Sequence, residues 1–218
     1  MLWALVPAKL SSAAKERLDP LVPPELRIEL ARAMLLDVLA ALEAADCFAG
    51  VAVVSRDREA LELAPGCRAT PIVERTAGLN GAVAQGVASC MASGATAVLI
   101  AMGDIPLVSP AEIRGVVERL PERGAVLVPS ADGTGTNILA LRPPDALPTR
   151  FGDASLDRHR SLARAVGVTA VVHEARGAAL DIDTIADLER LVAASRPTTA
   201  THGVLARARP ELGLSPAR

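Results

Sequence analysis

Short apolar runs alternate with longer helix-forming segments along the first two-thirds of the chain, and this alternation limits the possible folds. Buried strands are predicted for four apolar or β-branched runs, at residues 2–6, 51–55, 69–73 and 96–101. Between them, Pro24 opens a long helix with apolar residues at every fourth position from Leu26 to Leu42. A shorter helix is expected at 57–63 and another at 79–92. Such alternation predicts a mostly parallel sheet with helices on both faces, a three-layer α/β/α fold.

The pattern changes after a helix that Ser109 is expected to cap. Closely spaced strands at 125–128 and 137–141 predict an antiparallel insertion, so the sheet should be mixed. Further on, the sequence predicts a helix at 155–165, a strand at 168–173 and a last helix that ends near residue 194. No repeat or linker interrupts the chain, so one domain is predicted for residues 1–195. Residues 196–218, rich in Thr, Arg and Pro, are predicted to form a flexible C-terminal tail.

Composition and charge narrow the class of partner. The 218-residue chain has a net charge of −2, no Tyr and one Trp, which argues against a nucleic-acid or membrane partner. Its longest apolar run, 95–102, is shorter than a membrane span, and residues 1–6 are too short for the apolar part of a signal peptide. Three widely spaced cysteines, Cys47, Cys67 and Cys90, form neither a disulfide framework nor a metal motif. A cytoplasmic setting is therefore expected.

Ligands of open α/β sheets bind beyond the carboxyl ends of the strands, and a basic segment follows the first predicted strand. Lys9, Lys15 and Arg17 could hold a triphosphate and neutralise a departing pyrophosphate. The alternative is an ordinary solvated loop. The segment lacks the glycines and the Gly-Lys-Ser/Thr ending of a phosphate-binding P-loop.

Two aspartates are candidate metal ligands. Asp104 directly follows an apolar strand, where a carboxylate is costly unless it is paired or binds a cation. Together with Asp183 it could supply the one or two carboxylates that Mg²⁺ prefers beside phosphate oxygens. Alternatively, Asp104 is a turn residue before Pro106, and Asp183 caps the last helix. Asp181 completes a short D-x-D pattern that many unrelated sequences share.

Glycine-rich polar segments are candidate anion sites. The segment 132–137, which ends in Thr136 and Asn137, offers backbone N–H groups and polar side chains, although its Asp-Gly pair also suits a hairpin turn. Gly152 and Ser155 lie at a predicted helix start, where Ser155 could bind an anion or simply cap the helix. Asn80, at another helix start, could contact a ribose or base, or act as a cap. His159 lies between two arginines and is predicted to occupy a solvated helix face.

Taken in order, these segments resemble the CofC family of guanylyltransferases of coenzyme F420 biosynthesis. The resemblance covers residues 2–194. It rests on the ordered set of VPAK at 6–9, AKERL at 14–18, GLN at 78–80, GDIP at 103–106, DGTGTN at 132–137, FG at 151–152 with Ser155 and His159, and DIDT at 181–184 with Asp187-Leu188.

This resemblance implies a GT-A-like nucleotidyltransferase fold, GTP and Mg²⁺ as donor and cofactor, and transfer of GMP to a small phosphorylated carboxylic acid. That acceptor would be phosphoenolpyruvate, 2-phospho-L-lactate or 3-phospho-D-glycerate. The predicted metal ligands are Asp104 and Asp183, and the predicted catalytic residues are Lys9, Lys15 and Asp104. The predicted nucleotide-binding residues are Pro7, Lys9, Lys15, Arg17, Asn80 and Asp104, and the predicted acceptor-binding residues are Thr136, Asn137, Gly152 and Ser155. A homodimer is possible.

One residue departs from the family pattern, because many bacterial members that use phosphoenolpyruvate carry Thr where this chain has Asn137. The acceptor is therefore left open at this point. The alternatives are another GT-A nucleotidyltransferase, of the nucleotide-sugar or molybdopterin-dinucleotide type, and a non-catalytic nucleotide-binding protein. A glycosyltransferase is disfavoured because its D-x-D commonly lies mid-chain, whereas Asp181 and Asp183 lie late in this sequence.

Overall fold

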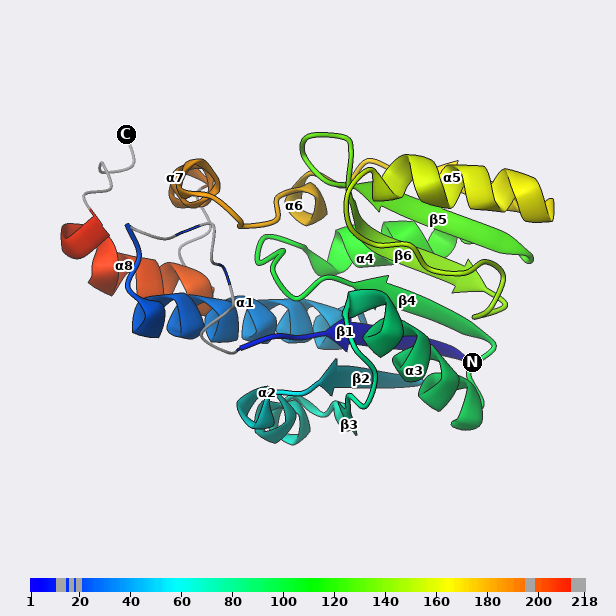
Figure 1. Cartoon of the computed structure of the whole chain (residues 1–218), viewed down its shortest axis with the longest axis horizontal. Coiled ribbons are helices and arrows are strands. Elements are labelled where there is room, and N and C mark those ends of the chain that lie inside the picture. The colour runs from blue at the N-terminus through cyan, green and yellow to red at the C-terminus, as the bar shows by residue number, and fades with distance from the viewer. Residues whose placement is uncertain (11–14, 16–17, 19–20, 195–198, 213–218) are drawn as a thin grey trace.

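The computed structural model describes residues 1–10, 15, 18, 21–194 and 199–212. Seven strands form one sheet in the order β3-β2-β1-β4-β6-β5-β7 (Figure 1). Of these strands, β6 alone runs antiparallel to its neighbours, which confirms the predicted mixed, mostly parallel sheet and the antiparallel insertion. The strands are β1 Leu2–Pro7, β2 Gly50–Ser55, β3 Thr70–Val73, β4 Ala97–Ala101, β5 Gly124–Pro129, β6 Thr136–Arg142 and β7 Thr169–Val172.

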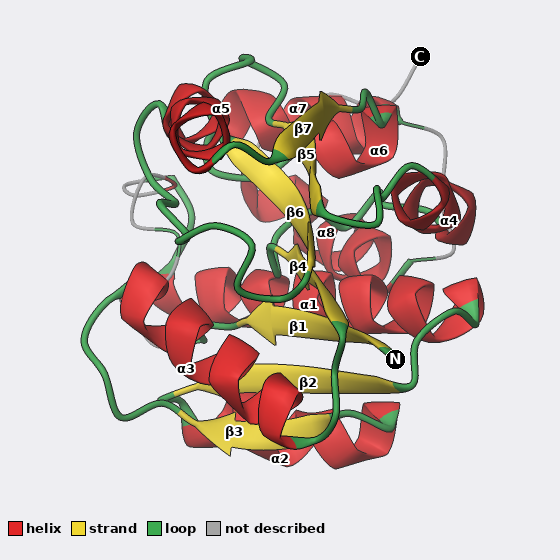
Figure 2. Ribbon diagram, turned by 90° about the vertical axis from the view of Figure 1, so that its right-hand side faces the viewer, coloured by secondary structure: helices red, strands yellow, loops and turns green. Residues whose placement is uncertain are grey.

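Helices cover both faces of the sheet, as the alternating pattern predicts (Figure 2). The side chains of β1 show why two faces are needed, because Ala4 and Val6 join one apolar cluster while Leu5 joins the other. The first cluster includes α1, α4 and α8, and the second includes α3 and α5. The helices are α1 Pro24–Ala45, α2 Arg58–Leu63, α3 Leu79–Ala92, α4 Pro110–Glu118, α5 Ser155–Val166, α6 Arg176–Ala179, α7 Ile185–Ala193 and α8 Ala200–Leu212, with a 3-10 turn at Ala64–Cys67.

Local chemistry sets several helix boundaries. Ser109 caps α4 as predicted, in a reciprocal capping box with Glu112. Gly86 lets α3 approach β1 closely, because a Cβ atom there would lie 2.6 Å from the Leu5 side chain. No helix in the described part of the chain is long and apolar enough to cross a membrane.

The predicted flexible tail is wrong for residues 200–212, which form α8 and pack against α1 (Figure 1). Val204, Leu205 and Ala208 are buried, because their spacing places them on one side of the helix. Asp37 of α1 accepts hydrogen bonds at the start of α8 from the backbone N–H of Ala200, 2.7 Å, and of Thr201, 3.0 Å. Composition alone misled the prediction, because it does not show that Thr201 is buried and hydrogen-bonded to Asp37 while Arg207 is exposed.

Leu205→Ala should therefore destabilise the protein. Leu205 is 2% exposed, so the truncation leaves a cavity between α8 and α1, and we expect a loss of about 2–5 kcal/mol in the free energy of unfolding. Urea denaturation followed by circular dichroism measures the change. Arg207→Ala on the exposed side of α8 is the matched control, and equal stabilities of the two variants would contradict a packed α8.

Candidate active site

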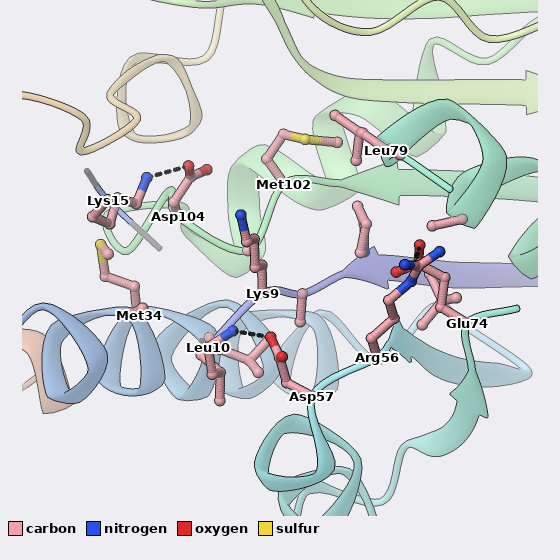
Figure 3. A pocket seen from close by; sticks show the side chains of 18 of the residues that line it. Lys9, Leu10, Lys15, Met34, Arg56, Asp57, Glu74, Leu79, Met102 and Asp104 are labelled. Atoms are coloured by element: carbon pink, nitrogen blue, oxygen red, sulfur yellow. Dashed lines mark hydrogen bonds and ion pairs between the residues drawn. The ribbon is translucent and has the colours of Figure 1, made fainter. Parts of the chain in front are cut away.

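A cleft of about 600 Å³ opens where four parallel strands end. Its walls include the residues that follow β1, β2, β3 and β4, together with the start of α3 and one side of α1 (Figure 3). This is the position at which open α/β sheets bind ligands. Of the predicted site residues in the described part of the chain, it brings together Pro7, Lys9, Lys15, Asp104 and Asp183.

The cleft holds a lysine between two carboxylates. Lys15 Nζ donates to Asp104 Oδ2 at 2.5 Å and to Asp183 Oδ1 at 2.8 Å. Because both carboxylates contact the same nitrogen atom, they lie within reach of a single cation. The three residues are far apart in the sequence, so the fold itself assembles this cluster.

Lys15 carries its charge in a nearly closed environment, with its side chain only 9% exposed. Burial alone would lower the pKa of its ammonium group, but the charges of Asp104 and Asp183 and their hydrogen bonds outweigh that effect and raise the pKa above its usual value. Lys15 also has φ of 56°, in the left-handed region that disfavours residues with a Cβ atom. The two ion pairs offset that local cost.

The two carboxylates fit the expected Mg²⁺ site. Asp104 Oδ1 is buried and has no hydrogen-bond partner among the described residues, which leaves a lone-pair oxygen available to a cation. Asp183 is not the helix cap, because Thr184 caps α7 in a capping box with Asp187. In the described part of the chain, no group of three or more His, Cys, Asp or Glu side chains is placed to hold a metal ion.

Asp181 is a third acidic residue near this cluster, outside the predicted set. Burial raises the pKa of its carboxyl group, and the negative charges of Asp104 and Asp183 raise it further. Its Oδ1 accepts a hydrogen bond from the Asn137 amide at 3.1 Å. The D-x-D pattern was the only signal of this residue in the sequence.

Lys9 and Arg17 complete the predicted basic segment. Lys9 is exposed, points into the cleft (Figure 3) and forms no ion pair with a described residue. It is therefore available to a ligand anion. Arg17 lies outside the described residues.

The predicted acceptor residues do not line this cleft, and two of their side chains are engaged in internal contacts. Asn137 is 4% exposed and donates from Nδ2 to the carbonyl oxygens of Ala178 and Ala179, both at 3.0 Å, as well as to Asp181. Thr136 is also 4% exposed and lies 3.1 Å from His159 Nδ1. Both side chains therefore contact neighbouring protein groups, and neither faces the cleft.

The other two acceptor candidates lie at the start of α5. Gly152 is exposed, with φ of 111°, a conformation that favours glycine. Ser155 is 1% exposed and is the first residue of α5, whose cap is Ala154 without a side-chain hydrogen bond, so capping by Ser155 is wrong. The Leu156 N–H donates to the Thr134 carbonyl at 3.0 Å. The two predicted acceptor segments are thus adjacent.

His159 is fully buried, so the predicted solvated position is wrong. Its Nε2 accepts a hydrogen bond from the Arg150 backbone N–H at 2.9 Å, which leaves the ring proton on Nδ1 to donate to Thr136. Burial lowers the pKa of His159 to about 4, and the charge of Arg150 adds to this shift. A neutral imidazole therefore holds the 150–155 loop against β6.

Asn80 is predicted to bind nucleotide or to cap α3, and the structure shows that its side chain is not the cap. Its Nδ2 donates to the Phe151 carbonyl at 3.0 Å, and its Oδ1 accepts from the Phe151 N–H at 2.8 Å. The helix α3 begins after Gly78 without a side-chain cap. Asn80 thus joins α3 to the loop that carries Gly152 and Ser155.

Three polar residues in the cleft were missed by the sequence prediction. Arg56 and Asp57 directly follow β2, and Glu74 directly follows β3. The rule that identified Asp104, a polar residue at the carboxyl end of a parallel strand, would have found all three.

The protein shares its fold with solved nucleotidyltransferases. A nucleotidyl transferase from Methanothermobacter thermautotrophicus has a TM-score of 0.64 at 22% identity, covering 88% of this chain and 95% of the other. A protein from Desulfovibrio desulfuricans assigned as a nucleotide-diphospho-sugar transferase has a TM-score of 0.78 at 18% identity, covering 97% and 96%. At these identities the likeness shows the fold.

The chain belongs to the CofC-like guanylyl transferase family, whose sequence profile matches residues 2–205. It is 40% identical over 188 residues to a phosphoenolpyruvate guanylyltransferase from Sphaerobacter thermophilus, covering 86% of this chain and 91% of the relative. It is 35% identical over 190 residues to a 2-phospho-L-lactate guanylyltransferase from Methanothermobacter thermautotrophicus, covering 87% and 83%. The recognised family and the expected enzyme class are thereby confirmed.

The buried His159 should make stability depend on pH. Its pKa of about 4 in the folded state lies below that of an unfolded histidine, so unfolding takes up a proton and stability falls as pH drops from about 6.5 towards 4. Between about pH 7 and pH 4.5 this group should remove about 2–3 kcal/mol from the free energy of unfolding. Urea denaturation of wild type and His159→Gln at both pH values measures this loss, which should be smaller in the variant. Equal losses would exclude His159 as its source.

Proposed function

We propose that this protein transfers GMP from GTP to phosphoenolpyruvate, with release of pyrophosphate, in coenzyme F420 biosynthesis. The observation that carries the proposal is Lys15 between Asp104 and Asp183 in a cleft at the strand ends of a CofC-like guanylyl transferase fold. Phosphoenolpyruvate is chosen because the Sphaerobacter thermophilus relative and a 38% identical relative from Conexibacter woesei carry that name. The relative named 2-phospho-L-lactate guanylyltransferase makes that compound the second choice.

Different residues of the cleft are proposed to bind the triphosphate and the metal ion. Lys9 and Lys15 supply positive charge for the triphosphate, and Pro7 forms the wall beside them. Asp104 and Asp183 are the groups that would hold Mg²⁺, with the unpartnered Asp104 Oδ1 as one ligand atom. When bound, Mg²⁺ would neutralise phosphate charge and align the donor with the acceptor.

The transfer needs no protein base. A phosphate monoester has a second pKa near 6, so the attacking oxygen of the acceptor is already ionised at neutral pH. That oxygen forms a bond to the α-phosphorus of GTP, the bond between the α-phosphorus and the bridging oxygen breaks, and pyrophosphate leaves with the electron pair. The main obstacle is repulsion between two polyanions, which the cations at Lys9 and Lys15 reduce.

The acceptor is expected to contact the 150–155 loop, where Gly152 and Ser155 lie at the start of α5. Asn80 holds this loop directly through the Phe151 backbone, whereas Thr136 acts on it through His159. These residues are therefore proposed to position the acceptor site. Arg17 is proposed to join the triphosphate contacts.

The test is pyrophosphate release by purified protein with GTP and Mg²⁺, offering phosphoenolpyruvate, 2-phospho-L-lactate and 3-phospho-D-glycerate separately. We expect the highest kcat/KM with phosphoenolpyruvate and no release when Mg²⁺ is chelated. Asp104→Asn should reduce turnover by at least about 10²-fold, since it removes charge at the reacting phosphates. Asp157→Asn, on the exposed surface of α5, is the matched control. Folded protein that binds GTP but turns over no acceptor would reject the proposal.

Asn80→Ala should weaken use of the acceptor more than use of GTP. The substitution removes both hydrogen bonds to Phe151 and loosens the loop with Gly152 and Ser155, so we expect the KM for the acceptor to rise about tenfold. Steady-state kinetics with each substrate varied in turn separates the two effects. A rise confined to the KM for GTP would instead support direct contact of Asn80 with the nucleotide.

A further inference from the structure

The cleft has a second polar end, away from the lysine and the paired aspartates. Arg56 and Glu74 lie together there, beyond Lys9 as seen from Asp104 (Figure 3). Both residues stand at the carboxyl ends of parallel strands, Arg56 after β2 and Glu74 after β3. Arg56 and Glu74 have no role in the triphosphate contacts that are proposed for Lys9 and Lys15 at the other end of the cleft.

Glu74 is held in place from several sides. Arg56 Nε donates to Glu74 Oε1 at 3.0 Å, and Arg56 Nη2 donates to the Thr76 carbonyl. The Glu74 backbone N–H donates to the Ser55 carbonyl at 2.8 Å. Gln85 of α3 fixes the residues on either side, because its Nε2 donates to the Val73 carbonyl at 2.7 Å and its Oε1 accepts from the Arg75 N–H at 2.8 Å.

The Glu74 carboxylate still has capacity to accept hydrogen bonds. Its side chain is 13% exposed, and its second oxygen, Oε2, accepts no hydrogen bond from the described residues. An ionised carboxylate can accept about four hydrogen bonds through its two oxygens. The ion pair with Arg56 orients this carboxylate, so Glu74 offers a fixed pair of acceptors at the wall of the cleft.

Apolar side chains lie beside this carboxylate. Leu79, at the first turn of α3, is 41% exposed although it is large and apolar, and it lines the cleft with Ala82 and Met102. In Figure 3, Leu79 and Met102 extend towards each other above Lys9. A flat ring bound against these side chains would cover apolar surface that is otherwise open to water.

We propose that Glu74 reads the guanine base of the donor nucleotide, by accepting hydrogen bonds from its N1–H and 2-amino groups. This inference rests on the proposed function, which places the triphosphate at Lys9 and Lys15. Guanine presents two adjacent donors on this edge, which match the two oxygens of one carboxylate. Adenine presents an unprotonated N1 there and no 2-amino group, so the same carboxylate would repel it.

Asp57 is the other carboxylate in this part of the cleft, and it already has a structural role. Its Oδ2 accepts the Leu10 backbone N–H at 2.5 Å, and its own backbone N–H donates to Ser55 Oγ at 2.9 Å. These bonds tie the residues after β2 to those after β1. We therefore expect Asp57 to maintain the structure of the cleft and Glu74 to select the base.

Inosine triphosphate tests the proposal directly, because it differs from GTP only by the missing 2-amino group. Wild type should bind GTP about 10-fold to 100-fold more tightly than ITP, the range expected for one hydrogen bond to a charged acceptor. Glu74→Gln should reduce this ratio to less than about 3-fold, mainly by weakening GTP binding. Calorimetric titration without acceptor measures both affinities independently of turnover.

Two control variants separate base selection from general damage. Glu62→Gln removes an exposed ion pair with Arg58 on α2 and should leave the GTP/ITP ratio unchanged. Asp57→Asn should weaken the binding of GTP and of ITP by the same factor, so the GTP/ITP ratio should not change. A ratio in Glu74→Gln equal to that of wild type would overturn the proposal, as would a wild type that binds GTP and ITP equally. Nucleotide binding is measured without acceptor, so it does not depend on turnover. A failure of GMP transfer would appear in the pyrophosphate assay, and a failure of base selection would appear in the GTP/ITP binding ratio.

Discussion

The ion pairs of Lys15 with Asp104 and Asp183 are the interaction on which the rest of the site depends. Two carboxylates that converge on one point repel each other, and burial makes that repulsion stronger. Lys15 neutralises them, and it thereby ties the segment after β1 to the end of β4 and to the start of α7. Removing one partner from this partly buried cluster leaves the remaining charges without their compensation. The same charges that hold these segments together are those that a nucleotide and its metal ion would use.

The ends of the parallel strands place different functional groups along the length of the cleft. In the proposed binding mode, residues after β4 and β1 supply the charges for phosphates, whereas Arg56 and Glu74, after β2 and β3, supply a fixed acceptor for a base. Neighbouring strands lie about 4.8 Å apart, so successive strand ends place groups at regular steps across the cleft. The sheet order β3-β2-β1-β4 thus runs from the base end to the phosphate end of the proposed binding mode.

The sequence predicted the sheet and most helices well, because apolar periodicity and capping residues such as Ser109 are local signals. It predicted the cluster of Lys15, Asp104 and Asp183 because all three follow the rule for strand ends or match the family pattern. Residue type does not reveal side-chain direction, so the sequence could not show that Asn80 and His159 hydrogen-bond the backbone of residues 150–151, or that His159 is buried. The helix α8 was missed because its few apolar residues are hidden among polar ones.

The antiparallel strand β6 shows why Thr136 and Asn137 could not both have faced one ligand. Adjacent residues of a strand point to opposite faces of the sheet. Thr136 accordingly meets His159 of α5, while Asn137 meets the carbonyl groups at the end of α6 and Asp181. One short segment therefore braces the 150–155 loop on one face of the sheet and the segment with Asp181 on the other. A Thr in place of Asn137 would lack the Nδ2 donor to Ala178, Ala179 and Asp181, so this exchange would act on the placement of the aspartates before it acted on any acceptor.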